Sequence, residues 1–277
     1  MPMSRWTIDE PTSLDFDGVV ALKATLISGS ISVLASDEKP SVHIDSVDGP
    51  PLVITHEAGM LTISHERMWE GVLSWLRQQR CRATVTVTVP RDCPVSINLV
   101  SADGMITGLH SRTSIKSAAG TVTLDGVTGA IDANTVSGAI EAQGLDGKVS
   151  FTSVSGDLSL AGGAVESLAA RTVSGRIAAD VDLNPDSRID VNTVSGEVVL
   201  RVPDWISAGV SLTSAAGRID TSFEGLDRQE RPFGRNIAGQ LGDGTGRLSV
   251  NSVSGRVTVL GRPSDDAPAI STPEMEK

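Results

Sequence analysis

Acidic side chains are the first candidates for chemistry in this sequence, because paired carboxylates can act as general acid and base and clustered carboxylates can bind Ca²⁺. Asp132 and Asp190 stand at the same position in two copies of a repeat, three copies apart. If the copies stack at the spacing of neighbouring strands, the two carboxylates lie ~14 Å apart, which is too far to act as a pair. We therefore expect both on a solvated face.

A second acidic group lies in one segment that connects two copies. Asp180, Asp182 and Asp186 are close enough in sequence to hold a cation between them. Asn184 and Pro185 in the same segment are equally typical of an ordinary turn. The sequence leaves both interpretations open.

The other residue types that support catalysis or metal binding are scattered. The histidines lack the spacing of zinc ligands, and neither a cysteine–histidine pairing nor a Gly-x-Ser-x-Gly motif occurs. The segment Gly242-Asp-Gly-Thr-Gly-Arg247 resembles a phosphate-binding loop, but it lacks a lysine and no helix pattern follows it. We predict no catalytic residue, no cofactor and no metal, and hence no enzyme. The histidines are His43, His56, His65 and His110.

Charge and cysteine content restrict the partners and the compartment. The formal net charge of -11 disfavours nucleic acid and anionic membrane surfaces, both of which attract basic faces. Two cysteines, Cys81 and Cys93, are too few for a disulfide scaffold, so we expect reduced thiols, although the strand between them would let them meet. The N-terminus lacks a secretory pattern, and no apolar run approaches the ~20 residues of a membrane span. We expect a cytoplasmic protein.

A repeat organises most of the chain. Its clearest copy is Asn134-Thr-Val-Ser-Gly-Ala-Ile-Glu-Ala142, and related copies are 16 to 21 residues apart, with one interval of 38. A fixed period of this size indicates a repeat architecture. The residues Ala21 to Ala35 already resemble the repeat. The marker glycines are Gly104, Gly120, Gly138, Gly156, Gly175, Gly196, Gly217 and Gly255.

Hydrophobic alternation within each copy predicts two short strands joined by a bend. Seven and five residues before the glycine, and two residues after it, the side chain is apolar in nearly every copy, while the intervening positions are polar. Ser or Thr stands three residues before each glycine, where its hydroxyl can satisfy backbone groups at the bend. Glycine is expected at the bend because it turns without a Cβ penalty.

These features predict an all-β protein: a right-handed parallel β-helix, or β-solenoid, of about eight to nine short two-strand rungs. We expect an N-terminal β region over residues 1–95, either first rungs or a cap. The apolar spacing around Trp69 indicates a short amphipathic helix over residues 66–80 within it. Solenoid repeats follow over residues 96–261, with a charged loop insertion at 222–247. A disordered tail is expected at 262–277.

Surface positions supply the candidate interaction residues. The position four before the glycine forms a polar strip suited to repeated hydrogen bonds with protein or glycan, or merely to solvation. Three tryptophans lie in insertions where burial in the core is not enforced. The strip residues are Lys116, Asn134, Thr152, Arg171 and Asn192, and the tryptophans are Trp69, Trp75 and Trp205.

The Thr-Val-Ser-Gly-x-Ile copies, together with the alternating strand Ala83 to Pro90, resemble a bacterial putative adhesin family of unknown function over roughly residues 20–260. The resemblance implies a β-helical or β-solenoid fold, no established enzymatic activity and, in some members, an association with cell-envelope stress. It supplies no catalytic residues.

Three functions remain in view. The leading hypothesis is a non-enzymatic scaffold or protein-interaction module that contacts a protein partner through residues 66–80 and the edge loops. The second is a homo-oligomer that assembles end to end or by edge stacking, because open solenoid ends expose unpaired strands. The third is a carbohydrate-binding or carbohydrate-active β-helix.

Overall fold

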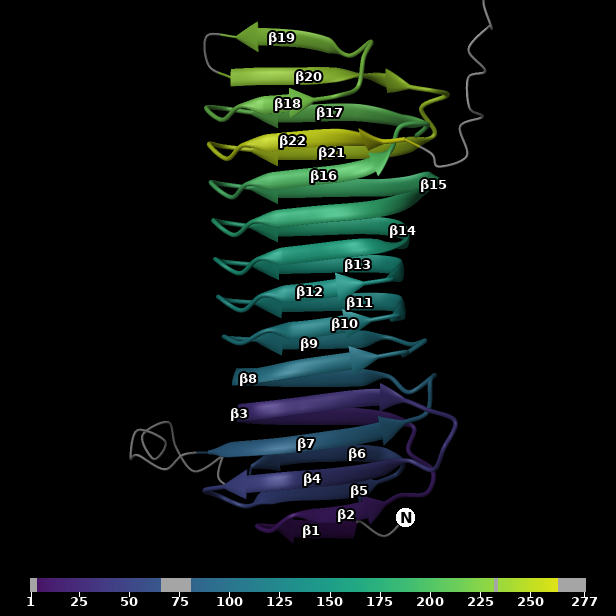
Figure 1. The fold of residues 1–277 in the computed structure, drawn as a ribbon, viewed down its shortest axis with the longest axis vertical. Coiled ribbons are helices and arrows are strands. Elements are labelled where there is room, and N and C mark those ends of the chain that lie inside the picture. The colour runs from purple at the N-terminus through teal and green to yellow at the C-terminus, as the bar shows by residue number, and fades with distance from the viewer. Residues whose placement is uncertain (1–3, 66–80, 232–233, 264–277) are drawn as a thin grey trace, which may run out of the picture.

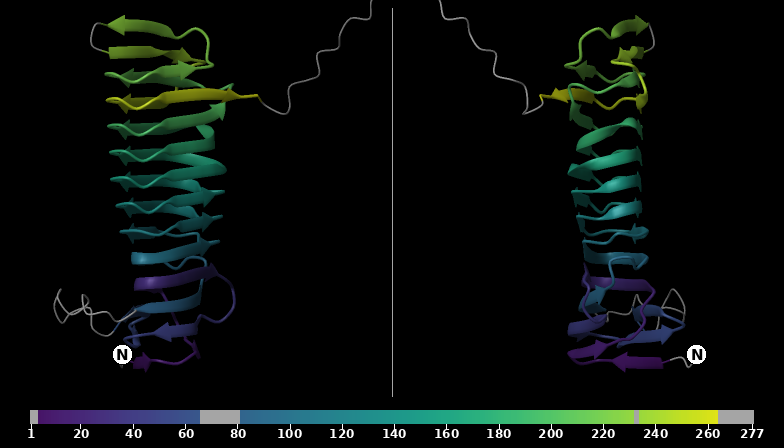
Figure 2. Two further views of the ribbon diagram at one scale, coloured as in Figure 1. Left: turned by 60° about the vertical axis from the view of Figure 1, so that its left-hand side comes forward. Right: turned by 90° about the vertical axis from the view of Figure 1, so that its right-hand side faces the viewer.

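The computed structural model describes residues 4–65, 81–231 and 234–263, and these residues form one column of stacked strands (Figure 1). Every regular element among them is a β-strand. Figure 2 shows the same column from two other sides, with one rung above the next. The all-β solenoid expected from the repeat is therefore confirmed. The helix predicted at residues 66–80 lies outside the described residues.

The strands follow the chain from one end of the column to the other, with the exceptions described below. They are β1 (Ser4–Ile8), β2 (Thr12–Asp15), β3 (Ala21–Ala35), β4 (Ser41–Asp48), β5 (Leu52–Glu57), β6 (Met60–His65), β7 (Arg82–Val89), β8 (Val95–Thr107), β9 (Thr113–Ser117), β10 (Val122–Asp125), β11 (Thr128–Thr135), β12 (Ile140–Gln143), β13 (Asp146–Ser153), β14 (Leu158–Thr172), β15 (Ile177–Thr193), β16 (Val198–Pro203), β17 (Ala208–Ser214), β18 (Ile219–Thr221), β19 (Asp227–Arg231), β20 (Gly234–Leu241), β21 (Gly246–Ser252) and β22 (Val257–Arg262).

Each rung contributes one strand to each of two parallel sheets. We call the sheet built before the glycine bend the first sheet and the one built after it the second sheet. In the second sheet Ile140 pairs with Val122 on one side and with Leu158 on the other, so like residues lie over like. In the first sheet Asn134 pairs in the same way with Lys116 and Thr152. Neighbouring copies therefore run parallel, as the repeat predicts.

The inward columns form a continuous aliphatic core. Ile140, Leu158 and Ile177 are at most 2% exposed, as are the aromatic core residue Phe151 and the polar exception Thr113. Burial of each aliphatic side chain stabilises the fold by roughly 1.5–3 kcal/mol relative to exposure. A single rung has no partner for its inner face, so the core exists only because the rungs stack.

The bend between the two sheets is held by the hydroxyl three residues before the glycine. The Gly138 N–H donates to Thr135 Oγ1 at 2.9 Å, and Gly175 repeats the bond to Thr172 Oγ1 at 3.0 Å. These hydroxyl residues are buried, so the bond satisfies a donor that water does not reach. The expected inward hydroxyl is confirmed.

The reason for glycine at the bend differs from the expected one. Gly138, Gly156 and Gly175 do not have a positive φ, so their backbone conformation is open to other residues. Instead, a Cβ on Gly175 would overlap the carbonyl oxygen of Gly156 in the rung below. The same overlap occurs at Gly196 with Gly175. At these four bends glycine is required by the close approach of stacked backbones, whereas Gly120 also has a φ of 104°, so at that bend the turn itself favours glycine, as expected.

The first marker glycine was placed two residues out of register. Gly29 pairs with Ala102, and a Cβ on Gly120 would meet the carbonyl of Ala102, so Ala102 and not Gly104 stands at the bend of its rung. Gly104 pairs with Val122, inside the second sheet. A shift of two residues keeps every side chain on the same face, so alternation alone cannot detect it.

The last two copies stack out of sequence order. Strands β21 and β22 pair with β15 and β16 on one side and with β17 and β18 on the other. The Gly255 rung is therefore inserted between the Gly196 and Gly217 rungs, and a Cβ on Gly217 would overlap the Gly255 carbonyl. The chain builds an outer rung first and then returns to fill the level beneath it.

The N-terminal region has the same arrangement. Strand β3 pairs in parallel with β8 on one side and with β6 and β7 on the other, so the first rung of the chain lies inside the stack. Antiparallel strands then close this end, with β2 and β4 beyond β7 and with β5 and β1 beyond β6. Residues 20–95 thus both continue the coil and cap it.

The charged insertion is not a loop throughout. Strands β19 and β20 form an antiparallel pair that lies on β17 and covers the first sheet at the C-terminal end (Figure 1). The polar composition of this segment suits an outer strand that faces solvent on one side, while Ile237 in β20 is buried against the core. Arg262, the first residue of the expected tail, ends strand β22 and pairs with Pro203.

Substitution of Gly175 by Ala tests the stacking constraint. The added methyl must displace the Gly156 backbone, and we expect the free energy of unfolding to fall by about 3 kcal/mol. Gly209→Ala is the matched control, because its φ is not positive and the nearest atom to its Cβ is 3.9 Å away. Urea unfolding of both variants measures the difference, and equal midpoints would contradict the constraint.

A second prediction concerns pH. His65 is buried, and burial lowers the pKa of its imidazole below the usual 6.5, although a hydrogen bond to the Pro50 carbonyl opposes the shift. In the unfolded chain the His65 imidazole is protonated as the pH falls below about 6.5, whereas in the folded chain it is protonated only at a lower pH. The free energy of unfolding therefore falls as the pH drops below about 6.5.

Thermal unfolding at about pH 7.5 and about pH 5.5 measures this dependence. We expect His65→Gln to reduce it and His110→Gln, at an exposed position, to leave it unchanged. An identical pH dependence in the wild type and His65→Gln would contradict the assignment to His65.

Candidate functional site

The carboxylates do not converge. Asp132 and Asp190 are held three rungs apart by the strand pairing, and Asp132 accepts a hydrogen bond from Asn134 Nδ2 at 3.0 Å on the solvated face. Across residues 4–65, 81–231 and 234–263, no group of three or more His, Cys, Asp or Glu side chains is arranged to hold a metal ion.

Arginines occupy the second acidic group. Arg262 Nη1 lies 2.6 Å from Asp180 Oδ1, and its other terminal nitrogen contacts Asp182. Arg201 Nε lies 3.3 Å from the second oxygen of Asp180. Asp180 and Asp182 are thus paired with guanidinium groups from two neighbouring strands, β16 and β22, and Asp186, the third carboxylate of the group, is exposed. The segment itself continues strand β15 rather than forming a turn.

The cysteines and histidines show no activation for catalysis. Neither cysteine is in a disulfide bond, and burial raises the pKa of the Cys93 thiol to about 11, which keeps it protonated. His43 lies 3.2 Å from Asp45 on the surface, and His56 packs edge-on against Phe16. These are structural contacts at separate places in the column.

The predicted polar strip exists as a column. Its five residues pair in sequence along the first sheet, from Lys116 through to Asn192. Asn192 then accepts a hydrogen bond from Asn251 Nδ2 at 3.1 Å, because the Gly255 rung follows next in space. The side chains of Lys116, Thr152 and Arg171 are exposed, and the column is flat and hydrophilic.

Of the three candidate tryptophans, one lies within the described residues. Trp205 is 62% exposed and lines a small apolar cavity of about 60 Å³ with Leu183 and Ile206, at the edge of the column. Trp69 and Trp75 lie outside the described residues. Trp205 therefore lies apart from the polar strip, and the six candidate residues that the structure describes do not form one site.

An exposed apolar column was missed by the sequence analysis. We call it the valine column: it consists of the residue two before the glycine in five rungs that are consecutive in space, and each side chain is 46–53% exposed. The signal was present, since a residue that follows an inward Thr or Ser must point outward. The members are Val136, Val154, Val173, Val194 and Val253.

A ladder of hydroxyls beside the valine column fixes its backbone. Ser155 Oγ donates to the Val136 carbonyl at 3.2 Å, and Ser195 Oγ donates to the Val173 carbonyl at 3.2 Å. Ser254 Oγ donates in the same way to Val194, across a sequence separation of 60 residues. Each valine is thus held on a bend that is bonded to the neighbouring rung, and the column is rigid.

Among the described residues, no helix has the length and apolar character that a membrane crossing requires. The family described as Toastrack DUF4097 matches residues 52–260. No curated protein matches the chain.

Several solved structures are similar to the chain. A putative adhesin from Bacteroides fragilis is 11% identical, with 93% of this chain and 97% of that chain covered and a TM-score of 0.40. A putative lipid binding protein from Parabacteroides distasonis is 15% identical, with 90% and 96% covered and a TM-score of 0.37. A putative cell adhesion protein from Clostridium sporogenes is 14% identical, with 91% and 100% covered and a TM-score of 0.27.

Arg262→Gln tests the ion-pair network at the edge of the column. Loss of the guanidinium removes its pairs with Asp180 and Asp182 and leaves Arg201 alone beside Asp180, and we expect the free energy of unfolding to fall by about 1 kcal/mol at low salt and by less at high salt. Urea unfolding at two salt concentrations measures this, with Arg112→Gln at an exposed position as the control. A salt-independent loss would contradict the electrostatic origin.

Proposed function

This chain belongs to the Toastrack DUF4097 family, and we propose that it is a non-enzymatic interaction module whose rigid solenoid presents the valine column to a protein partner. The observation that supports this most directly is the column itself: five half-exposed valines on consecutive rungs. Contiguous exposed apolar surface rimmed by polar residues is typical of interaction sites. The adhesin-like names of similar structures agree with an interaction role.

The dimensions of the valine column suit a protein ligand. Five rungs at the spacing of neighbouring strands extend over ~19 Å, which equals the length of about thirteen helical residues or six residues of a strand. The column is one side chain wide, and the polar strip runs beside it through Asn134, Thr152 and Arg171. Burial of the valines supplies affinity, and the polar neighbours supply hydrogen bonds at the rim.

The chemistry of the described residues favours this function over catalysis. The acidic group at Asp180 is bonded to arginine, the Cys93 thiol stays protonated and no metal-binding cluster occurs in the described part of the chain. The outer strand of the first sheet at the C-terminal end favours it over end-to-end stacking on that sheet. Strand β19, with the sequence Asp-Arg-Gln-Glu-Arg, presents a charged outer edge, and such edges disfavour strand addition.

Further parts of the proposal come from the sequence. We propose that residues 66–80, with Trp69 and Trp75, add to the partner contact as a short helix, together with the edge loops near Trp205. A cytoplasmic location, a link to cell-envelope stress and right-handed winding in about eight to nine rungs are proposed on the same basis. Deletion of residues 66–80 tests the helix, and an unchanged partner set would count against it.

The valine column is tested with Val173→Asp, which places a charge in its middle. The folded full-length protein is used to capture partners from a lysate of the source organism, and bound proteins are quantified by mass spectrometry. Ser159→Asp is the matched control, because it adds the same charge to an exposed position of the second sheet. We expect Val173→Asp to lose partners that the wild type and Ser159→Asp retain.

Circular dichroism and thermal unfolding confirm that both variants are folded. Partner sets that are identical for all three proteins would rule out the valine column as the binding surface.

A further inference from the structure

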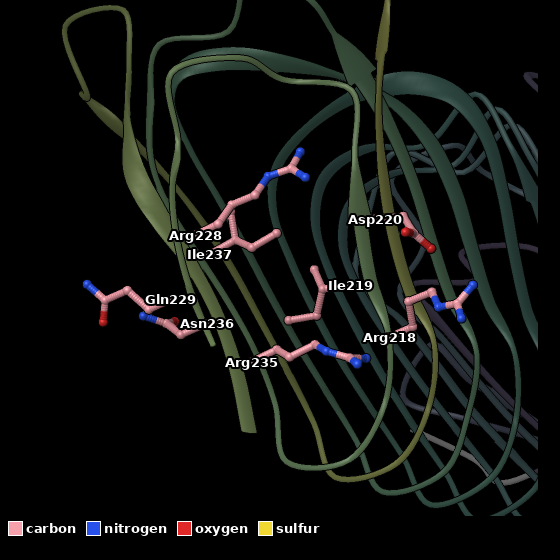
Figure 3. A pocket seen from close by; sticks show the side chains of 8 residues that line it. All are labelled: Arg218, Ile219, Asp220, Arg228, Gln229, Arg235, Asn236 and Ile237. Carbon is pink, nitrogen blue, oxygen red and sulfur yellow. The ribbon is translucent and has the colours of Figure 1, made fainter. Parts of the chain in front are cut away.

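A cavity of about 310 Å³ opens at the C-terminal end of the column, beside the bend of the Gly217 rung, which stacks on the last rung of the valine column. Figure 3 shows Ile219 and Ile237 in its middle, with the side chains of Arg218, Arg228 and Arg235 arranged around them. Both isoleucines are buried, at 8% and 5% exposure, and form an apolar floor. The remaining lining residues are Asp220, Gln229 and Asn236.

The cavity exists because the two sheets end at different levels. The first sheet continues past β17 with β20 and β19, whereas the second sheet ends in the described structure at β18, which pairs with β22 alone. The hairpin of β19 and β20 therefore has no strand of the second sheet opposite it, because that sheet ends at β18. Within the hairpin, Arg228 pairs with Ile237.

The outer edge of β18 adds backbone donors to the cavity. The Arg218 carbonyl accepts from Val257 N–H at 2.9 Å, and Ser222 N–H donates to the Val259 carbonyl at 3.2 Å. Alternate residues of a strand direct their backbone groups to opposite edges. Ile219 and Thr221 therefore direct their N–H and carbonyl groups away from β22, toward the open level.

Charge at this end contrasts with the rest of the chain. The cavity lining carries three arginines and one aspartate, in a protein whose formal net charge is -11. Arg256 lies in the rung directly beneath Arg218, since β18 and β22 pair at Ile219 and Val257. Arg235 Nη1 donates to the Gly217 carbonyl at 3.1 Å, which holds its guanidinium at the glycine bend. Such anchoring orients an arginine before a ligand arrives.

From this geometry we propose that the cavity is a binding site for a small amphipathic anion: a phosphate or carboxylate group carried by a compact apolar body. Guanidinium groups bind both anions with paired, charge-assisted hydrogen bonds. The isoleucine floor requires an apolar part, because a bare inorganic anion would leave it in contact with water. The volume lies at the lower end of small-molecule pockets, which restricts the ligand to a compact molecule.

The surrounding charge excludes extended polyanions. A nucleic acid would also meet the acidic remainder of the surface, which repels phosphates beyond the cavity. A single anionic group would contact only the lining of the cavity, and so would avoid that repulsion.

The proposal is tested by isothermal titration calorimetry of the full chain with phenyl phosphate, inorganic phosphate and phenol. We expect phenyl phosphate to bind at one site with a Kd of about 1 mM, and the other two to bind at least tenfold more weakly. The double substitution Arg218→Gln and Arg228→Gln should weaken phenyl phosphate at least tenfold. Arg171→Gln on the first sheet is the control, and should leave binding unchanged.

Asp220→Asn is an independent test, because removal of the carboxylate found among the described lining residues should tighten phenyl phosphate binding. Thermal unfolding establishes that each variant is folded. Equal binding by the wild type and the double variant, equal binding of inorganic and phenyl phosphate, or no saturable binding by the wild type would each overturn the proposal.

Discussion

The close approach of stacked glycine bends is the constraint on which the rest of this structure depends. A parallel ladder fixes neighbouring strands about 4.8 Å apart, and at the bends the carbonyl of one rung occupies the space in which a Cβ of the next would lie. With glycine at that position the two sheets keep their spacing through the corner. Without it the ladder opens, and the aliphatic columns on either side lose their contacts.

Each residue of the Thr-Val-Ser-Gly bend has a different structural role. The inward hydroxyl of Thr135 satisfies the glycine N–H of its own rung, and the outward Ser155 hydroxyl bonds the rung beneath it. Glycine admits the neighbouring backbone. The valine side chain is left half exposed, and its recurrence on five spatially consecutive rungs gives the protein a rigid apolar line along the bends.

At both ends of the column, the rung nearest the chain terminus is inserted one level inside the stack. The first rung of the chain, β3, and the last, β21 with β22, each lie one level inside the stack, while strands from nearer the middle of the chain form the outermost parallel rung. An inserted rung has strand partners on both sides, so the terminal rungs of the chain are not left as frayed edges. The antiparallel strands then close the N-terminal end on both sheets but the C-terminal end on one, and this difference creates the arginine-lined cavity.

The sequence by itself determined the fold class, the two-strand rung and the inward and outward columns. In a strand that covers an apolar core, alternation of apolar and polar residues decides which side chains face inward. It also contained the valine column, which follows from the inward hydroxyl at the preceding position. The order of the rungs and the register of the first one were decided only in three dimensions. The repeats present nearly identical inner faces, so Gly255 stacks on Gly196 as well as Gly217 would, and a shift of two residues at Gly104 leaves every side chain on its face. The cavity arises from that order, since Arg218, Arg228 and Arg235 meet only because β18 ends the second sheet one level below the hairpin of β19 and β20.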